Sequence, residues 1–135
     1  MNAEIITIGD EILIGQIIDT NSAWMAKELN AIGIDIIQIS SIKDEKENIV
    51  IALNEAKLRA DIVFITGGLG PTSDDITRQT LAAYFNLELE LNEEALANIQ
   101  NILSKRNIPI GKNNEMQAWL PQGAIAIQNA RGTAP

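Results

Sequence analysis

The chain has no cysteine and no histidine among its 135 residues. Without cysteine it has neither a disulfide framework nor a thiolate metal site, which agrees with a location in the reducing cytoplasm. Without histidine, a bound metal must be a hard cation with oxygen ligands. A general base must then be a carboxylate, a lysine, a tyrosine or a metal-bound water.

Positive charge and long apolar runs are also scarce. Ten Lys and Arg residues face 18 Asp and Glu residues, which gives a net charge of -8 and a pI of about 4.4. Duplex binding depends on cations that neutralise phosphates, so we expect no nucleic-acid partner. The start MNAEIITIGDE lacks the pattern of a signal peptide, and nowhere do eighteen apolar residues run together, so we expect a cytoplasmic protein without membrane segments.

What the sequence does contain is one alternating pattern. Short apolar runs rich in β-branched residues alternate with segments of helical period, and 46% of the residues are hydrophobic. The expected strands are Glu4–Ile8, Ile34–Ile42 and Asp61–Thr66, and the expected helices span residues 19–33, 44–60, 74–85 and 92–106. This βαβαβα order predicts a parallel sheet covered on both faces, within one domain of residues 1–135.

The helix ends are marked by capping residues. Asp19, Thr20 or Asn21 can cap the first helix, and Gly33 can stop it. Asp44, with a glutamate three residues later, is better explained as a cap of the second helix than as a ligand. The fourth helix should direct Leu96, Ile99 and Leu103 inward.

The last thirty residues are less regular. Ala124–Gln128 alternates like a short strand, and the chain stops at Arg131–Pro135, where a glycine-containing turn would normally lead into another element. We therefore expect the domain to be truncated at this end.

Two loops after strands form the candidate site. The first expected strand ends in Gly9-Asp10-Glu11 and the third in Thr66-Gly67-Gly68, so a strand order of 2-1-3 would place the two loops side by side. Gly67, Gly68 and Gly70 allow a close approach of backbone N–H groups, and the following helix adds its dipole, which together favour a phosphate.

Two carboxylates follow this glycine-rich loop. Asp74 and Asp75 would repel a bare phosphate, but they suit a Mg²⁺-like ion that bridges carboxylate and phosphate oxygens, with Asp10 approaching from the first strand. Thr72 and Asp75 also match a capping box, and from the residues alone this structural interpretation is favoured for Asp75.

Four motifs together resemble one family. They are GDEIL and DTN within Gly9–Asn21, RADIVFITGGLGPTSDDITRQT at Arg59–Thr80, QAWLP at Gln117–Pro121, and RGTAP at Arg131–Pro135. The whole chain resembles the N-terminal domain of the CinA family of competence/damage-inducible proteins, which is similar to the molybdopterin-binding domains of molybdenum-cofactor biosynthesis. The resemblance implies a three-layer α/β/α fold around a mostly parallel mixed sheet with one antiparallel strand.

The resemblance also implies an activity and a site. The family is associated with hydrolysis of ADP-ribose to AMP and ribose 5-phosphate, which depends on a divalent metal such as Mg, Mn or Co. Asp10 and Asp75 would hold the metal, Asp75 or Asp74 would orient the attacking water or take its proton, and a homodimer is expected. The implied residues for the nucleotide and its phosphates are Gly67, Gly68, Gly70, Thr72, Ser73, Asn21, Lys112, Gly132 and Thr133.

The sequence departs from the family in two places. Many members carry a basic residue just before the Gln-Ala of the QA motif, where this chain has Glu115-Met116; Lys112 or Arg78 could replace that cation. The deamidase domain that often follows in the family is absent, so we expect no deamidase activity.

Two other functions stay open. One is binding or adenylylation of a molybdopterin-type pterin phosphate. The other is a non-catalytic oligomerising or ligand-sensing domain of a longer nicotinamide-nucleotide deamidase.

Overall fold

The computed structural model describes residues 1–135, which form two compact units, residues 1–68 (unit 1) and 69–135 (unit 2). Each unit has its own β-sheet. None of the six helices combines the length and apolarity needed to cross a membrane.

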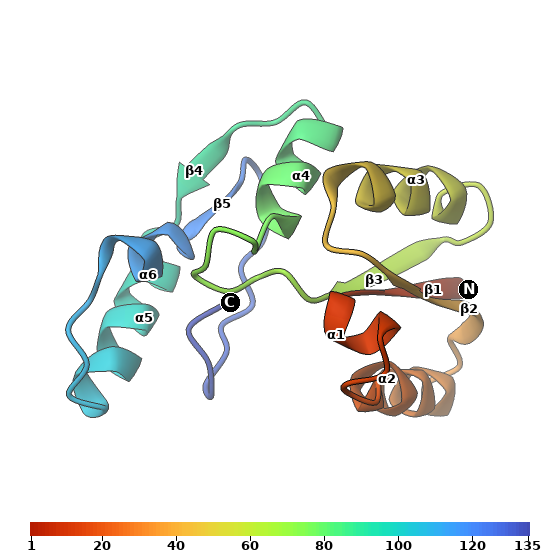
Figure 1. The fold of residues 1–135 in the computed structure, drawn as a ribbon, viewed down its shortest axis with the longest axis horizontal. Coiled ribbons are helices and arrows are strands. Elements are labelled where there is room, and N and C mark those ends of the chain that lie inside the picture. Colours follow the sequence, from red (N-terminus) through yellow and green to blue (C-terminus); the bar gives the residue numbers. More distant parts are fainter. The chain divides into compact units, whose positions relative to one another are not determined.

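Unit 1 is built on a parallel sheet. β1 (Asn2–Ile8) lies between β2 (Asp35–Ile42) and β3 (Ile62–Thr66), which confirms the predicted order 2-1-3. α2 (Thr20–Ala31) and α3 (Lys46–Ala56) cover opposite faces of this sheet, so unit 1 has three layers (Figure 1).

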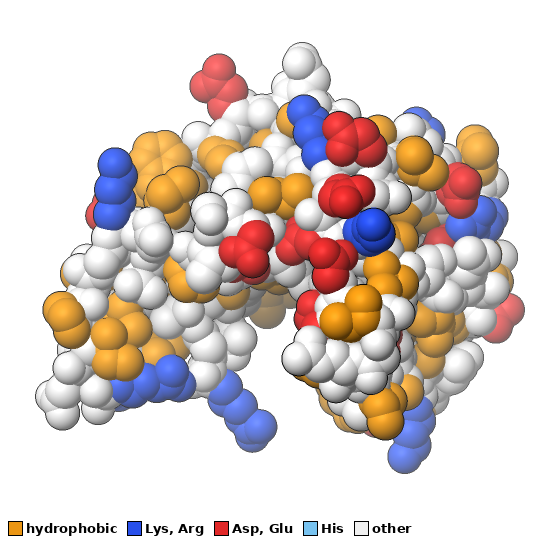
Figure 2. Space-filling view, in the orientation of Figure 1, with side chains coloured by type: hydrophobic (Ala, Val, Ile, Leu, Met, Phe, Trp, Pro, Cys, Tyr) orange, Lys and Arg blue, Asp and Glu red, His pale blue; other side chains and the backbone are white.

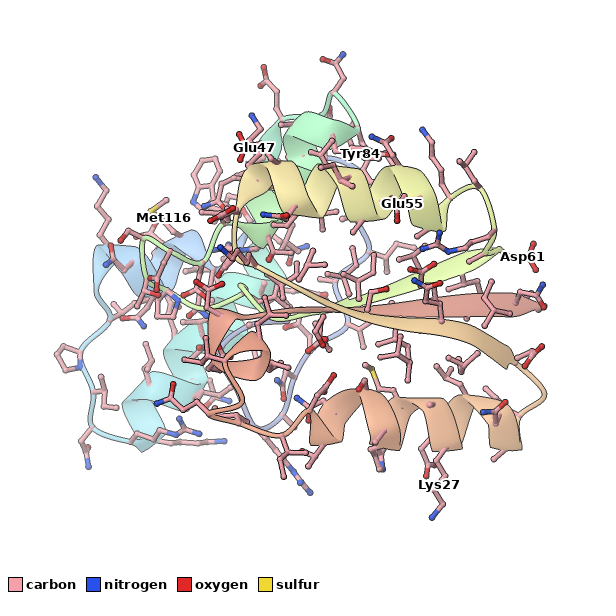
Figure 3. The ribbon with its side chains drawn as sticks, turned by 45° about the vertical axis from the view of Figure 1, so that its right-hand side comes forward. Lys27, Glu47, Glu55, Asp61, Tyr84 and Met116 are labelled. Carbon is pink, nitrogen blue, oxygen red and sulfur yellow. The ribbon has the colours of Figure 1, made fainter.

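The centre strand of this sheet forms the core of unit 1. All of Ala3, Ile5, Ile6 and Ile8 are at most 3% exposed, as expected of a parallel strand that is covered on both faces. Lys27 projects from α2 away from the sheet (Figure 3), and some large apolar residues of this unit are also exposed, among them Ile18 and Trp24.

The helix ends in unit 1 show which caps operate. Asp19 caps α2, because its carboxylate accepts a hydrogen bond from the Ser22 backbone N–H at 3.0 Å, and Gly33 ends the helix at a positive φ of 84°. The prediction of Asp44 as a cap was wrong. Glu45 is the N-cap residue of α3, without a side-chain cap, since its carboxylate accepts instead from the Asn48 side chain at 2.7 Å.

A buried ion pair crosses unit 1. Glu4 on β1 is fully buried, and its two carboxylate oxygens accept from Arg59 Nε at 2.8 Å and Nη2 at 2.9 Å. The hydrogen bond to Glu4, with its charge, raises the pKa of Arg59 despite some desolvation. This forked contact ties the segment before β3 to the centre of the sheet.

Unit 2 contains the remaining elements. They are α4 (Thr77–Tyr84), β4 (Leu89–Leu91), α5 (Glu93–Lys105), α6 (Lys112–Met116) and β5 (Trp119–Pro121). β4 and β5 pair antiparallel in a two-stranded sheet of their own (Figure 1). The antiparallel strand implied by the family resemblance therefore belongs here to a second sheet.

The core of unit 2 lies under α5. The predicted helix over residues 92–106 is confirmed, with Asn92 as its N-cap residue, accepting from the Ala95 N–H at 2.8 Å. The inward positions are also confirmed, because Ile99 and Leu103 are buried and Leu96 packs against them.

Two boundaries in unit 2 differ from the sequence predictions. α4 begins at Thr77 and not near Asp74, since the preceding residues form turns. The strand expected at Ala124–Gln128 is absent, because no neighbouring strand pairs with this segment, and Ile125 and Ile127 are 91% and 82% exposed.

Candidate functional site

The ends of β1 and β3 lie side by side, as the strand order predicts. Gly67 has a φ of +102°, and a Cβ atom added there would lie 1.9 Å from the Ile8 carbonyl oxygen. Only glycine can therefore occupy the first position after β3 without displacing β1. Asp10, which begins α1 (Asp10–Leu13), directly follows β1.

The predicted site residues fall on both units. Asp10, Asn21, Gly67 and Gly68 belong to unit 1, whereas the loop from Gly70 onward belongs to unit 2. A shared role of Asp10 and Asp75 in metal binding stays a prediction.

In unit 2, Asp75 holds a tight turn. Its Oδ2 atom accepts from the Thr72 backbone N–H at 2.9 Å and from the Thr72 hydroxyl at 2.5 Å. A Cβ atom at Gly70 would lie 2.4 Å from the same oxygen, so this approach requires glycine. The contact resembles half of a capping box, but α4 begins only at Thr77, so Asp75 organises the loop itself.

The surroundings of Asp75 favour its ionised form. Partial burial raises the pKa of Asp75. This effect is outweighed by hydrogen bonds from the Thr72 side chain and backbone and from the Gly70 backbone, together with the charge of Arg78. The pKa of Asp75 is therefore held below its ordinary value of 3.8. A carboxylate of lowered pKa is a weaker base, which favours a structural role.

This lowered pKa predicts how acid affects stability. The native state binds the Asp75 proton less tightly than the unfolded state, so the carboxylate stabilises the fold above about pH 4 and this contribution disappears as the pH falls through the native pKa. We expect Asp75→Asn to lose less stability than the parent chain on acidification. Urea unfolding at a series of pH values from neutral downward checks this, and parallel losses in both proteins would contradict it.

The neighbouring Asp74 is different. Its side chain is exposed and makes no hydrogen bond within the protein. Of the two carboxylates, Asp74 is thus the one that is free to contact a water molecule or a ligand.

The turn borders a pocket of about 280 Å³, called here the loop pocket. Gly70–Ser73 forms one side, and the other lining residues are Arg78, Gln79, Asn113 and Met116. The structure therefore brings together Gly70, Thr72 and Ser73 of the predicted phosphate loop.

Arg78 is the buried cation of the loop pocket. It is 7% exposed, and its Nη1 atom donates to the carbonyl oxygens of Met116 and, at 3.1 Å, of Trp119. Burial lowers the pKa of Arg78 and the charge of Asp75 opposes this, but a guanidinium stays charged at any physiological pH. Its Nε atom is buried without a partner.

The QA motif has a structural role that its sequence does not reveal. Gln117 is 2% exposed, and its Nε2 atom donates to the Leu69 carbonyl oxygen at 3.3 Å, while Ala118 lies in the core of unit 2. Gln117 thus ties the start of the glycine-rich loop to the end of α6.

Asp74 and Asp75 do not line the loop pocket, and neither do three other predicted residues of unit 2. Lys112 begins α6 and is exposed. Gly132 donates its backbone N–H to the Asn129 side chain at 3.2 Å, and Thr133 follows it. A role of Gly132 and Thr133 in ligand binding stays a prediction.

The acidic side chains of the chain do not form a ready-made metal site. No group of three or more acidic side chains that could hold a metal ion occurs in the structure. However, Mg²⁺ is often bound by one or two carboxylates together with substrate phosphates. Asp74 and Asp75 are two adjacent carboxylates and do not form a preassembled site, and metal binding stays a prediction.

Comparison with known sequences gives one consistent result. The family described as "Probable molybdopterin binding domain" matches residues 4–133. A CinA-like protein from Cytophaga hutchinsonii is 47% identical over 98% of this chain and 32% of its own length. A putative competence-damage inducible protein from Caldicellulosiruptor bescii is 43% identical over the whole chain and 33% of its own length. The chain thus spans about a third of these relatives.

Solved structures agree with this result. A crystal structure of the protein CinA from Thermoplasma acidophilum has a TM-score of 0.87 and 33% identity, and covers 99% of this chain and 78% of that one. The tungsten cofactor synthesizing protein MoaB from Pyrococcus furiosus has a TM-score of 0.61 and 26% identity, and covers 89% and 78%. The chain therefore belongs to the molybdopterin-binding domain family, and its relatives include CinA-like proteins.

Proposed function

We propose that this chain hydrolyses the pyrophosphate bond of ADP-ribose to give AMP and ribose 5-phosphate, with the help of a divalent Mg, Mn or Co ion. The observation that carries the proposal is the loop pocket, which is lined by Gly70, Thr72 and Ser73 and followed in the chain by the exposed Asp74 carboxylate. Water and a pyrophosphate are the reactants that such groups can hold together.

The loop binds the phosphates. Thr72 and Ser73 are exposed and line the pocket, and because Asp75 holds the Thr72 hydroxyl and backbone N–H, Ser73 supplies the hydroxyl for a phosphate. Asp75 keeps the turn in this shape, and the buried charge of Arg78 makes the pocket more favourable for an anion.

Asp74 acts on the water. Its carboxylate accepts a hydrogen bond from a water molecule and takes a proton as the water oxygen bonds to phosphorus, while the bridging P–O bond breaks and its electron pair leaves with the other phosphate. When bound, the divalent ion would neutralise the charge of the pyrophosphate and lower the pKa of a water molecule.

The test is AMP release from ADP-ribose, followed by chromatography with and without Mg²⁺. We expect the parent chain to release AMP only with the ion, and Asp74→Asn to be slower by a factor of about 100 or more, as is typical for loss of a general base. The matched control is Glu88→Gln, an exposed carboxylate of unit 2 outside the loop pocket. Equal rates for the two variants would exclude Asp74 from the reaction.

A second candidate function is supported by the family description itself, which names molybdopterin. A pterin phosphate would place its phosphate on the same loop without turnover. Tight binding of a pterin phosphate, with no AMP formed under any metal, would favour this candidate. The homodimer and the cytoplasmic location stay predictions, as does a ligand-sensing role in a longer protein.

A further inference from the structure

A second pocket of unit 2, called here the Trp119 pocket, has a volume of about 390 Å³ and a different character. Its apolar lining consists of Leu89, Met116 and Trp119, and its polar lining residues are Arg78, Gln79, Lys112 and Glu115. Ligand pockets usually combine an apolar lining with a few polar groups in this way, and this volume lies within their usual range.

The two pockets are neighbours. Arg78, Gln79 and Met116 line both the Trp119 pocket and the loop pocket. Because the two pockets share these lining residues, a single ligand with an apolar end and a phosphate end can extend from one into the other. Met116, which lies at the end of α6 (Figure 3) and directly precedes the QA motif, is one of these shared residues.

The backbone of Trp119 is held in a sheet, and the residue is 40% exposed. It begins β5 and pairs with Leu91 of β4, so its backbone is held by the two-stranded sheet. Figure 2 shows apolar side chains that reach the surface of the molecule among scattered Lys and Arg side chains. An indole that is held in a pocket and partly open to solvent is a suitable surface for stacking of a planar ring.

Arg78 lines both pockets and links two segments of the chain around them. Its single Nη1 atom binds the carbonyl oxygens of both Met116 and Trp119, so α4 is fastened to the segment that carries the apolar lining. The buried Nε atom without a partner lies in a side chain that lines both pockets. Arg78 is thus a positioning residue for the Trp119 pocket.

We propose that the Trp119 pocket binds the nucleobase of a nucleotide whose phosphate occupies the loop pocket. This inference rests on the proposed function, since it takes the ligand to be a nucleotide. Trp119 stacks on the base, and Leu89 and Met116 pack around it. The polar rim of Lys112 and Glu115 contacts the edge of the base or the ribose.

The test is a fluorescence titration of the Trp24→Phe chain, in which Trp119 is the remaining tryptophan. We expect AMP to change the Trp119 emission and ribose 5-phosphate to bind more weakly, because it lacks the base. An AMP titration without any change in Trp119 emission would overturn the proposal, as would equal affinities for AMP and ribose 5-phosphate. Neither result depends on a substitution within the pocket.

Two variants measure how much the Trp119 side chain contributes to AMP binding. Calorimetry should show that Trp119→Leu weakens AMP binding roughly tenfold, the usual effect of losing one base–aromatic stack, and leaves pyrophosphate binding unchanged. The control is Trp24→Leu, which removes an exposed tryptophan of unit 1, and circular dichroism verifies folding of both variants. Equal AMP affinity of the two variants would contradict the proposal.

Failure of the base-pocket proposal can be distinguished from failure of the proposed hydrolysis. AMP binding that depends on Trp119 in a chain that does not hydrolyse ADP-ribose would support the base pocket and refute the hydrolysis. Hydrolysis of ADP-ribose with an AMP affinity that does not depend on Trp119 would support the hydrolysis and refute the base pocket.

Discussion

Replacing Gly67 with alanine is expected to destabilise the chain by about 3 kcal/mol or more, at the upper end of single substitutions. The new Cβ atom would lie 1.9 Å from the Ile8 carbonyl oxygen, which belongs to the backbone of the centre strand and cannot rotate away. The positive φ of 102° adds strain for any side chain. Urea unfolding measures the loss, with the exposed Trp24 as the reporter of unit 1.

Gly33→Ala is the matched control for this prediction. Gly33 also has a positive φ, of 84°, but a Cβ atom there would have no neighbour within 4 Å. We expect this variant to lose only about 1 kcal/mol, the cost of the backbone conformation alone. Equal losses in the two variants would mean that the approach of β3 to β1 is looser than the structure shows.

Replacing Arg78 with methionine is the second large effect that we expect, with a loss of about 3 kcal/mol in the stability of unit 2. The carbonyl oxygens of Met116 and Trp119 would lose their common donor in a buried position, and each such loss costs about 1–3 kcal/mol. Arg78→Lys should not restore stability, because an ammonium group lacks the planar fork of a guanidinium. Unfolding followed by the emission of Trp119 measures both variants.

Arg106→Met is the control for Arg78. Arg106 also donates from its guanidinium to a backbone carbonyl oxygen, that of Arg131 at 3.1 Å, but on the exposed surface of the same unit. Its replacement should change stability by no more than about 0.5 kcal/mol. Similar losses for Arg78→Met and Arg106→Met would show that burial of the Arg78 contacts contributes little.

Local patterns were sufficient to predict the strands of unit 1. The apolar run of β1 is continuous because both of its faces are covered, and Gly33 and Asp19 mark the ends of α2 by chemistry that acts within a few residues. The prediction that the loops after β1 and β3 lie side by side depended on the order 2-1-3, which the structure confirms, and the contact of Gly67 with Ile8 required the structure.

Contacts between residues that are far apart in the sequence could not be predicted from such local patterns. Arg78 was predicted as a substitute cation for the ligand, but its partners Met116 and Trp119 lie about forty residues further along the chain, and only the fold brings them to it. The bidentate contact of Glu4 with Arg59 was not predicted for the same reason. The segment from Ala124 has the period of a strand, but a strand also needs a partner, which its own sequence cannot specify.

The candidate site was predicted in part. The motif selected Gly70, Thr72 and Ser73, which line one pocket in the structure, and the alternative of a structural role for Asp75 also came from its residues. Phosphate binding by these residues stays a prediction. The distinction between Asp74 and Asp75 required the structure, because adjacent carboxylates look equivalent in a sequence. Only the hydrogen bonds show that Asp75 is engaged with Thr72.

The most direct test of the central claim is a phosphorus NMR measurement of ADP-ribose incubated with the chain and Mg²⁺ in water enriched in heavy oxygen. We predict that the pyrophosphate signals are replaced by those of two phosphomonoesters, with one heavy oxygen per turnover in AMP or in ribose 5-phosphate. That result would establish attack of water on phosphorus. Persistence of the pyrophosphate signals with Mg²⁺, Mn²⁺ and Co²⁺ alike would contradict the claim that this domain is a pyrophosphate hydrolase.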